Sequence, residues 1–174
     1  MIKISYKKFF LNITSIWFLN DDIKNFYDNQ ITFIHDYNGE IENNLYIYYK
    51  HHSSIINLEN NIDDIFHNIS KNYRYDIRKA SNENIKINFY RSNDLIQNKK
   101  LIDNFYLDYK KFVRAKKIKN SFNKKAIKKY ILSGNLILSN AVYNNNILVQ
   151  HIYVCDGIYT RLLYSVSNFR TGYF

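Results

Sequence analysis

The stretch that decides the fold is residues 136–167, which read LILSNAVYNNNILVQHIYVCDGIYTRLLYSVS. Apolar and polar residues alternate within it, as they do in strands that bury one face. Two interruptions, Asn144-Asn145-Asn146 and Asp156-Gly157, consist of residues that favour tight turns. The stretch therefore predicts an antiparallel meander of three strands: Leu136 to Tyr143, Ile147 to Cys155, and Tyr159 to Ser167.

Helical periodicity precedes the meander. From Asn61 to Ala80 apolar residues recur at steps of three and four, with acids in the first turn and bases in the last. Asn60 is the expected N-cap of this helix. A strand from Ile85 to Tyr90 follows. Further helices are expected at about Asn98 to Lys117 and Lys124 to Leu132, the last of them ended by Gly134.

The N-terminal third carries weaker signals. Phe33, Leu45, Ile47 and Tyr49 suggest short strands, with Asn38-Gly39 as a turn between them. The run from Phe9 to Leu19 resembles a signal peptide in shape but lacks a cleavage site, so an ordinary strand or surface helix is expected. We therefore predict an α+β protein with a short β-rich segment at 1–53 and the main domain at 54–174.

Positive charge is concentrated in one region. Residues 97–130 hold twelve Lys or Arg and two acids, whereas the rest of the chain holds thirteen of each sign. Such a localised surface suits RNA, the phosphates of an activated donor, or an anionic membrane bearing a pyrophosphate-linked substrate. The alternative is a solvated helix face whose lysines reflect an AT-rich genome.

Several chemistries are excluded by the residues present. Four glycines cannot supply a Walker loop or a dinucleotide-binding turn, and no metal-ligand spacing occurs. The single cysteine, Cys155, cannot form an intramolecular disulfide, and its apolar surroundings predict a buried, inert thiol. The residues identify no catalytic group.

Polar residues gather on the last strand of the meander. Strict alternation would place Arg161, Ser165 and Ser167 on one face, where a guanidinium and two hydroxyls could hold a phosphate or a polarised carbonyl. A solvent-facing side of an edge strand is the competing interpretation. His151, in the middle of the preceding strand, is more typical of a packed, hydrogen-bonded histidine than of a general base.

Three segments taken in order resemble a known family. They read INLENNIDDI at 56–65, SKNYRYDIRKA at 70–80 and RLLYSVSNFR at 161–170. A long helix with Phe105, Tyr106 and Tyr109 is expected between the second and third of these segments. Over about residues 54–170 the set is similar to FemABX-type aminoacyl ligases of the GNAT acyltransferase superfamily, including members associated with cell-surface polysaccharide loci.

This resemblance implies a GNAT-like, largely antiparallel sheet with helices on its faces. It also implies acyl or aminoacyl transfer to an amine of a peptidoglycan or surface-polysaccharide precursor, with acyl-CoA or aminoacyl-tRNA as co-substrate and no separate cofactor. Arg74 and Arg78 would contact donor phosphates, and Arg161, Ser165, Ser167 and Arg170 would lie near the acceptor-side cleft. We add His151 to this binding set.

The family's pattern continues past the final strand, whereas this chain ends at Phe174. We therefore expect a C-terminally truncated domain, or one completed by a partner such as a second copy. An anionic cell-envelope precursor and a peripheral contact with the inner face of the membrane are further expected partners of a cytoplasmic protein. The alternatives are an inactive remnant of such an enzyme and a non-enzymatic, basic RNA-binding protein.

Overall fold

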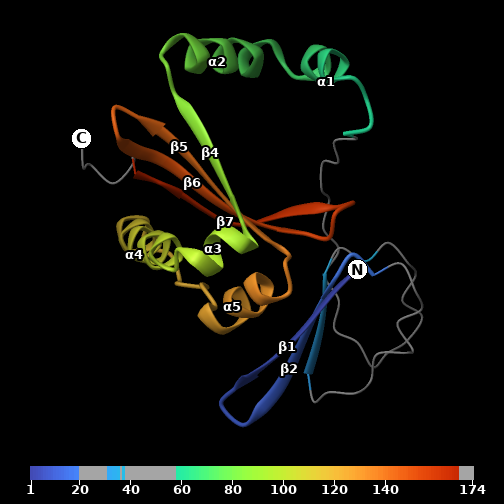
Figure 1. The fold of residues 1–174 in the computed structure, drawn as a ribbon. Coiled ribbons are helices and arrows are strands. Elements are labelled where there is room, and N and C mark those ends of the chain that lie inside the picture. The colour runs from blue at the N-terminus through green and yellow to red at the C-terminus, as the bar shows by residue number, and fades with distance from the viewer. Residues whose placement is uncertain (20–30, 36, 38–57, 169–174) are drawn as a thin grey trace. The chain divides into compact units, whose positions relative to one another are not determined.

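The computed structural model describes residues 1–19, 31–35, 37 and 58–168 (Figure 1). The chain forms two compact units, one made of Met1–Gly39 with Ile87–Phe174 and the other of Glu40–Lys86. The predicted α+β class is confirmed, with two mostly antiparallel sheets and five helices among the described residues. The predicted boundary between 53 and 54 lies outside those residues, as do Asn38-Gly39, Leu45, Ile47 and Tyr49.

A four-stranded sheet dominates the larger unit. Its strands run in the order β4-β5-β6-β7, and the pairs β5–β6 and β6–β7 are antiparallel. The predicted meander is therefore confirmed, with boundaries within two residues of those expected. The strands are β4 (Lys86–Arg91), β5 (Leu136–Tyr143), β6 (Asn146–Cys155) and β7 (Thr160–Ser167).

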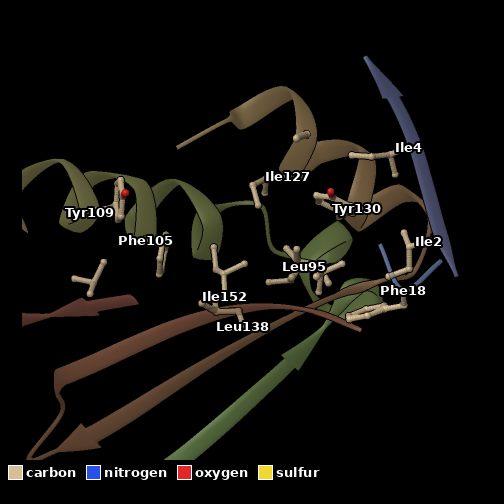
Figure 2. Packing of buried hydrophobic residues seen from close by; sticks show 14 of the residues in the cluster. Ile2, Ile4, Phe18, Leu95, Phe105, Tyr109, Ile127, Tyr130, Leu138 and Ile152 are labelled. Carbon is tan, nitrogen blue, oxygen red and sulfur yellow. The ribbon is translucent and has the colours of Figure 1, made fainter. Parts of the chain in front are cut away.

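Three helices pack against this sheet: α3 (Ser92–Gln97), α4 (Lys100–Ala115) and α5 (Lys124–Leu132). Their apolar residues and those of the strands form the hydrophobic core shown in Figure 2, where Phe105 of α4 lies near Leu138 and Ile152 of the strands. The predicted helices at 98–117 and 124–132 are thus present as α4 and α5. Short α3 was not predicted as a separate helix. It begins where Asp94 accepts a hydrogen bond from the backbone N–H of Arg91 at 2.8 Å.

A second, three-stranded sheet forms the N-terminal part of the same unit. It consists of β1 (Ile2–Lys8), β2 (Leu11–Trp17) and β3 (Ile31–His35), with β1–β2 antiparallel and β2–β3 parallel. Ile2, Ile4 and Phe18 join the hydrophobic core beside α5 (Figure 2). The run from Phe9 to Leu19 therefore contains a strand, one of the two outcomes expected for it.

The smaller unit corrects one prediction. The single helix expected from Asn61 to Ala80 is two helices, α1 (Ile62–Asn68) and α2 (Lys71–Asn82). The backbone is extended at Ile69 (φ −73°, ψ 148°), and the Ser70 hydroxyl accepts a hydrogen bond from the backbone N–H of Tyr73 at 3.4 Å. Serine is a strong N-cap, so Ser70 starts a new helix although the apolar spacing continues through it.

The apolar stripe predicted for this region is not buried. Neither α1 nor α2 contains a buried residue, and Ile62, Tyr73 and Ile77 are exposed. The Asn61 side chain, rather than Asn60, caps α1 by accepting from the Asp63 backbone N–H at 3.0 Å. Among the described residues, no helix combines the length and apolar character that crossing a bilayer requires.

Candidate functional site

A β-bulge in β7 decides which polar side chains share a face of the sheet. Ile152 pairs with Tyr164, but the next residue, Tyr153, pairs with Leu162, so β7 contains one extra residue, Leu163. Such an insertion interrupts the alternation of side chains along its strand. Both Leu163 and Tyr164 pack against the hydrophobic core.

The bulge overturns the prediction that Arg161, Ser165 and Ser167 share one face. Arg161 pairs with the buried Val154 and so lies on the helix-covered face of the sheet. Ser165 pairs with His151, whose face is opposite, because residues alternate along β6. The prediction is wrong because strict alternation was assumed through Leu162-Leu163. The structure separates the guanidinium from the two hydroxyls.

The same register brings three other polar residues together. Ser139 of β5 pairs with His151 of β6, and His151 pairs with Ser165 of β7. Directly opposite residues in antiparallel strands have Cβ atoms about 5 Å apart and project from the same face. We call Ser139, His151 and Ser165 the polar row. It spans β5, β6 and β7 on the face opposite the hydrophobic core and ends at β7, the edge strand of the described sheet.

His151 is the only member of the polar row with an ionisable side chain. Burial lowers the pKa of His151 below its usual value because the charged imidazolium loses hydration. Its Nδ1 atom is buried and has no hydrogen-bond partner among the described residues. The Tyr153 ring lies beside it, with 5.8 Å between the ring centroids. His151 is therefore held neutral, and a neutral imidazole between two hydroxyls can accept a proton or a hydrogen bond.

Arg74 and Arg78, expected at donor phosphates, both have local contacts in the smaller unit. Arg74 Nη1 donates to the backbone carbonyls of His67 and Ile69, the latter at 2.8 Å, and so satisfies the end of α1. The Arg78 guanidinium lies over the Phe66 ring, 5.4 Å from its centroid. These contacts connect α1 to α2. Arg170 lies outside the described residues.

The basic region forms a surface on two helices of the larger unit. Its twelve cationic residues are all exposed and lie before α4, on α4 and α5, and in the segment between them. We call this the basic helix surface. Of its two acids, Asp103 lies 3.9 Å from Lys124 and Asp108 lies 3.8 Å from Lys111. Two acids offset little of the charge, so the surface has a formal excess of ten positive charges.

Tyr106 lies within the basic helix surface. Lys124 Nζ is 4.0 Å from the centroid of its ring, and Lys110 Nζ is 4.8 Å from it. Two ammonium groups beside one aromatic ring raise the local positive potential and so favour the binding of an anion there. This proximity arises from the i, i+4 spacing of Tyr106 and Lys110, together with the position of Lys124, the first residue of α5, near α4.

A buried polar cluster on the helix-covered face escaped sequence reasoning. Gln150 is buried, and its side-chain amide donates to Asp108 Oδ2 of α4 at 2.8 Å. Asn140 pairs with Gln150 in register and is 3% exposed, and its Oδ1 has no hydrogen-bond partner in the described part of the chain. The available signal was one amide residue in the middle of each of two neighbouring strands, Asn140 in β5 and Gln150 in β6.

No group of three or more His, Cys, Asp or Glu residues suited to a metal occurs within residues 1–19, 31–35, 37 and 58–168. Comparison with protein-family models and with curated proteins finds nothing that matches this chain. Its function must therefore be argued from the polar row and the basic helix surface.

Proposed function

We propose that the protein transfers an acyl or aminoacyl group from a phosphate-bearing donor, aminoacyl-tRNA or acyl-CoA, to an amine of an anionic cell-wall or surface-polysaccharide precursor. The observation that carries the proposal is the basic helix surface, because a localised excess of ten positive charges attracts a polyanionic donor strongly. The order of elements is compatible with the resemblance to FemABX-type ligases. The protein acts in the cytoplasm.

The polar row supplies the reacting centre in this proposal. The hydroxyls of Ser139 and Ser165 orient the donor carbonyl, and a neutral His151 takes the proton that the attacking amine loses as its nitrogen bonds to the carbonyl carbon. The ester bond to tRNA or the thioester bond to CoA then breaks, and His151 returns the proton to the leaving oxygen or sulfur. Holding ester and amine together accounts for much of the rate in such reactions, so a second catalytic group is not required.

The path from the basic helix surface to the polar row passes around one strand. α4 packs against β7, where the rings of Tyr109 and Tyr164 are 5.4 Å apart. Since β7 is at the edge of the sheet formed by the described residues, a donor with a long, flexible end can bind on α4 and reach Ser165 on the other face. This arrangement suits the acceptor end of a tRNA or the pantetheine arm of CoA.

Product formation tests the proposal. The protein is incubated with acyl-CoA or aminoacyl-tRNA and a peptidoglycan precursor that bears a free amine, and the acylated precursor is measured by mass spectrometry. We expect product with one donor class, and a rate about 100-fold lower for His151→Asn, because a positioned base contributes on this scale. The matched control is Ser133→Ala, away from the polar row. Absence of product with both donors would contradict the proposal.

A non-enzymatic RNA-binding protein is the second candidate. The observation that favours it is Tyr106 with Lys110 and Lys124 beside it, since aromatic rings among cations are typical of surfaces that bind single strands. In that case deacylated RNA binds as tightly as aminoacyl-tRNA, and His151→Asn does not change the affinity for either RNA. An inactive remnant of a transferase would show neither product nor a preference for any donor.

A further inference from the structure

The β1–β2 hairpin ends in an apolar tip. Lys8 of β1 pairs with Leu11 of β2, so Phe9 and Phe10 alone form the turn (Figure 1). Their side chains are 81% and 92% exposed, and their ring centroids are 6.5 Å apart. Single exposed apolar residues are common on proteins, but two adjacent phenylalanines at a protruding turn are not needed for packing. We call Phe9 and Phe10 the phenylalanine tip.

The turn itself would be more stable with other residues. Phe9 has a φ of 55°, in the left-handed region that bulky side chains avoid. Two-residue hairpin turns require positive φ at their first central residue and normally place Asn, Asp or Gly there. Phe9 thus combines an exposed aromatic ring with an unfavourable backbone conformation. Unfavourable conformations that serve no packing purpose are found mainly at functional positions.

Cations surround the phenylalanine tip. Lys7 and Lys8 precede it directly and are exposed. Lys125, in the first turn of α5, donates from Nζ to the backbone carbonyl of Lys7 at 3.0 Å, which brings the end of the basic helix surface to the hairpin. Apolar side chains bordered by lysines are complementary to a surface that is apolar inside and negatively charged outside.

We propose that the phenylalanine tip inserts into the interfacial region of an anionic lipid bilayer, with Lys7, Lys8 and Lys125 beside the headgroups. A single apolar insertion or a few cations bind a membrane weakly, whereas the two together hold a protein there. The rings project from a turn and carry no polar group, which suits insertion better than the stacking of bases on a strand face. This inference does not depend on the proposed transfer reaction.

The test is co-sedimentation of the whole chain with vesicles of phosphatidylcholine alone or mixed with phosphatidylglycerol. We expect binding to the anionic vesicles that weakens as salt is raised, because headgroup attraction is screened. Phe10→Ser should weaken the binding at least about tenfold, since it removes one of the two exposed aromatic side chains that the bilayer would bury. The matched control is Ile158→Ser, at a residue 82% exposed in the β6–β7 turn, and it should leave binding unchanged.

Phe9→Asn separates a lipid contact from a loss of folding. Asparagine tolerates positive φ, so this variant should melt at a higher temperature than the wild type and yet bind anionic vesicles more weakly. Equal vesicle binding by the wild type, Phe9→Asn and Phe10→Ser would overturn the proposal. It would also be overturned if both substitutions reduced RNA binding and the wild type did not sediment with anionic vesicles.

Discussion

At the scale of single residues, two buried polar groups distinguish this sheet from an ordinary apolar one. Burial favours the neutral form of His151 on one face, and on the other face the side-chain oxygen of Asn140 has no hydrogen-bond partner among the residues that the structure describes. Unsatisfied buried groups are rare in proteins because each costs about 1–3 kcal/mol. The two residues therefore allow direct tests of whether the sheet is built for stability alone.

His151 should make the protein sensitive to acid. Its pKa is lower in the folded than in the unfolded chain, so its contribution to stability is present above about pH 6.5 and is lost as the pH falls below that value, where the unfolded chain takes up the proton. We expect His151→Asn to flatten the decline in the free energy of unfolding between neutral and mildly acidic pH. Urea titrations at several pH values measure this. An unchanged decline would mean that other groups cause it.

Asn140 should be replaceable by an apolar residue. Asn140→Leu removes an oxygen that has no partner in the described residues, so we expect the free energy of unfolding to rise by about 1 kcal/mol. The contrasting variant is Gln150→Leu, which should lower it by a similar amount because Asp108 loses its 2.8 Å hydrogen bond. Equal destabilisation by both variants would show that Asn140 has a partner in solution.

At the scale of elements, sequence patterns predicted most of the larger unit. Alternation located β5, β6 and β7, and helical spacing located α4 and α5. These patterns succeed because each element buries one face in the shared core. They failed where a local hydrogen bond or an inserted residue decides the outcome. Ser70 divides a continuous apolar stripe, and Leu163 reverses the face on which Arg161 lies.

The candidate site was predicted only in part. The sequence pattern identifies His151 and Ser165 as separate candidates. It does not predict that they pair, because the register between β6 and β7 depends on a bulge. Ser139 was missed because one serine in an apolar strand is a weak signal. The pair Leu162-Leu163, two apolar residues in succession, was a usable sign that the alternation fails there.

The break between α1 and α2 can be tested at Ser70. Ser70→Ala removes the side-chain oxygen that accepts from the Tyr73 N–H, and loss of an N-cap costs a helix about 1 kcal/mol. We expect faster amide hydrogen exchange in the first turn of α2. Ser81→Ala, near the other end of α2, serves as the control because its hydroxyl donates to Ile77 O and does not cap the helix. Equal exchange rates in the two variants would contradict this role.

At the scale of the whole molecule, stability and function depend on different parts. The hydrophobic core joins β1, β2, β5, β6 and β7 to α3, α4 and α5 around residues such as Phe105 and Leu138. The charge is carried by exposed residues that do not enter this core. Charge can therefore be removed from the basic helix surface with little effect on folding, and binding of the donor can be tested on its own.

Removal of a core side chain should affect the fold as a whole. Phe105 is fully buried among Tyr109, Phe122 and the strands, so Phe105→Ala should lower the free energy of unfolding by about 3–5 kcal/mol. Urea denaturation followed by circular dichroism measures it. The exposed Leu132 offers a control, since Leu132→Ala should change stability by less than about 0.5 kcal/mol. A small effect at Phe105 would mean that the core is not packed as described.

The central claim is that the basic helix surface binds the phosphates of the donor. The most direct measurement is the affinity for aminoacyl-tRNA and for acyl-CoA at several salt concentrations, with the wild type and with a variant in which Lys110, Lys111, Lys124 and Lys128 are glutamine. We predict a steep loss of affinity with salt for one donor in the wild type, and both a lower affinity and a shallower salt dependence in the variant. The same affinity and the same salt dependence in both proteins would contradict the claim.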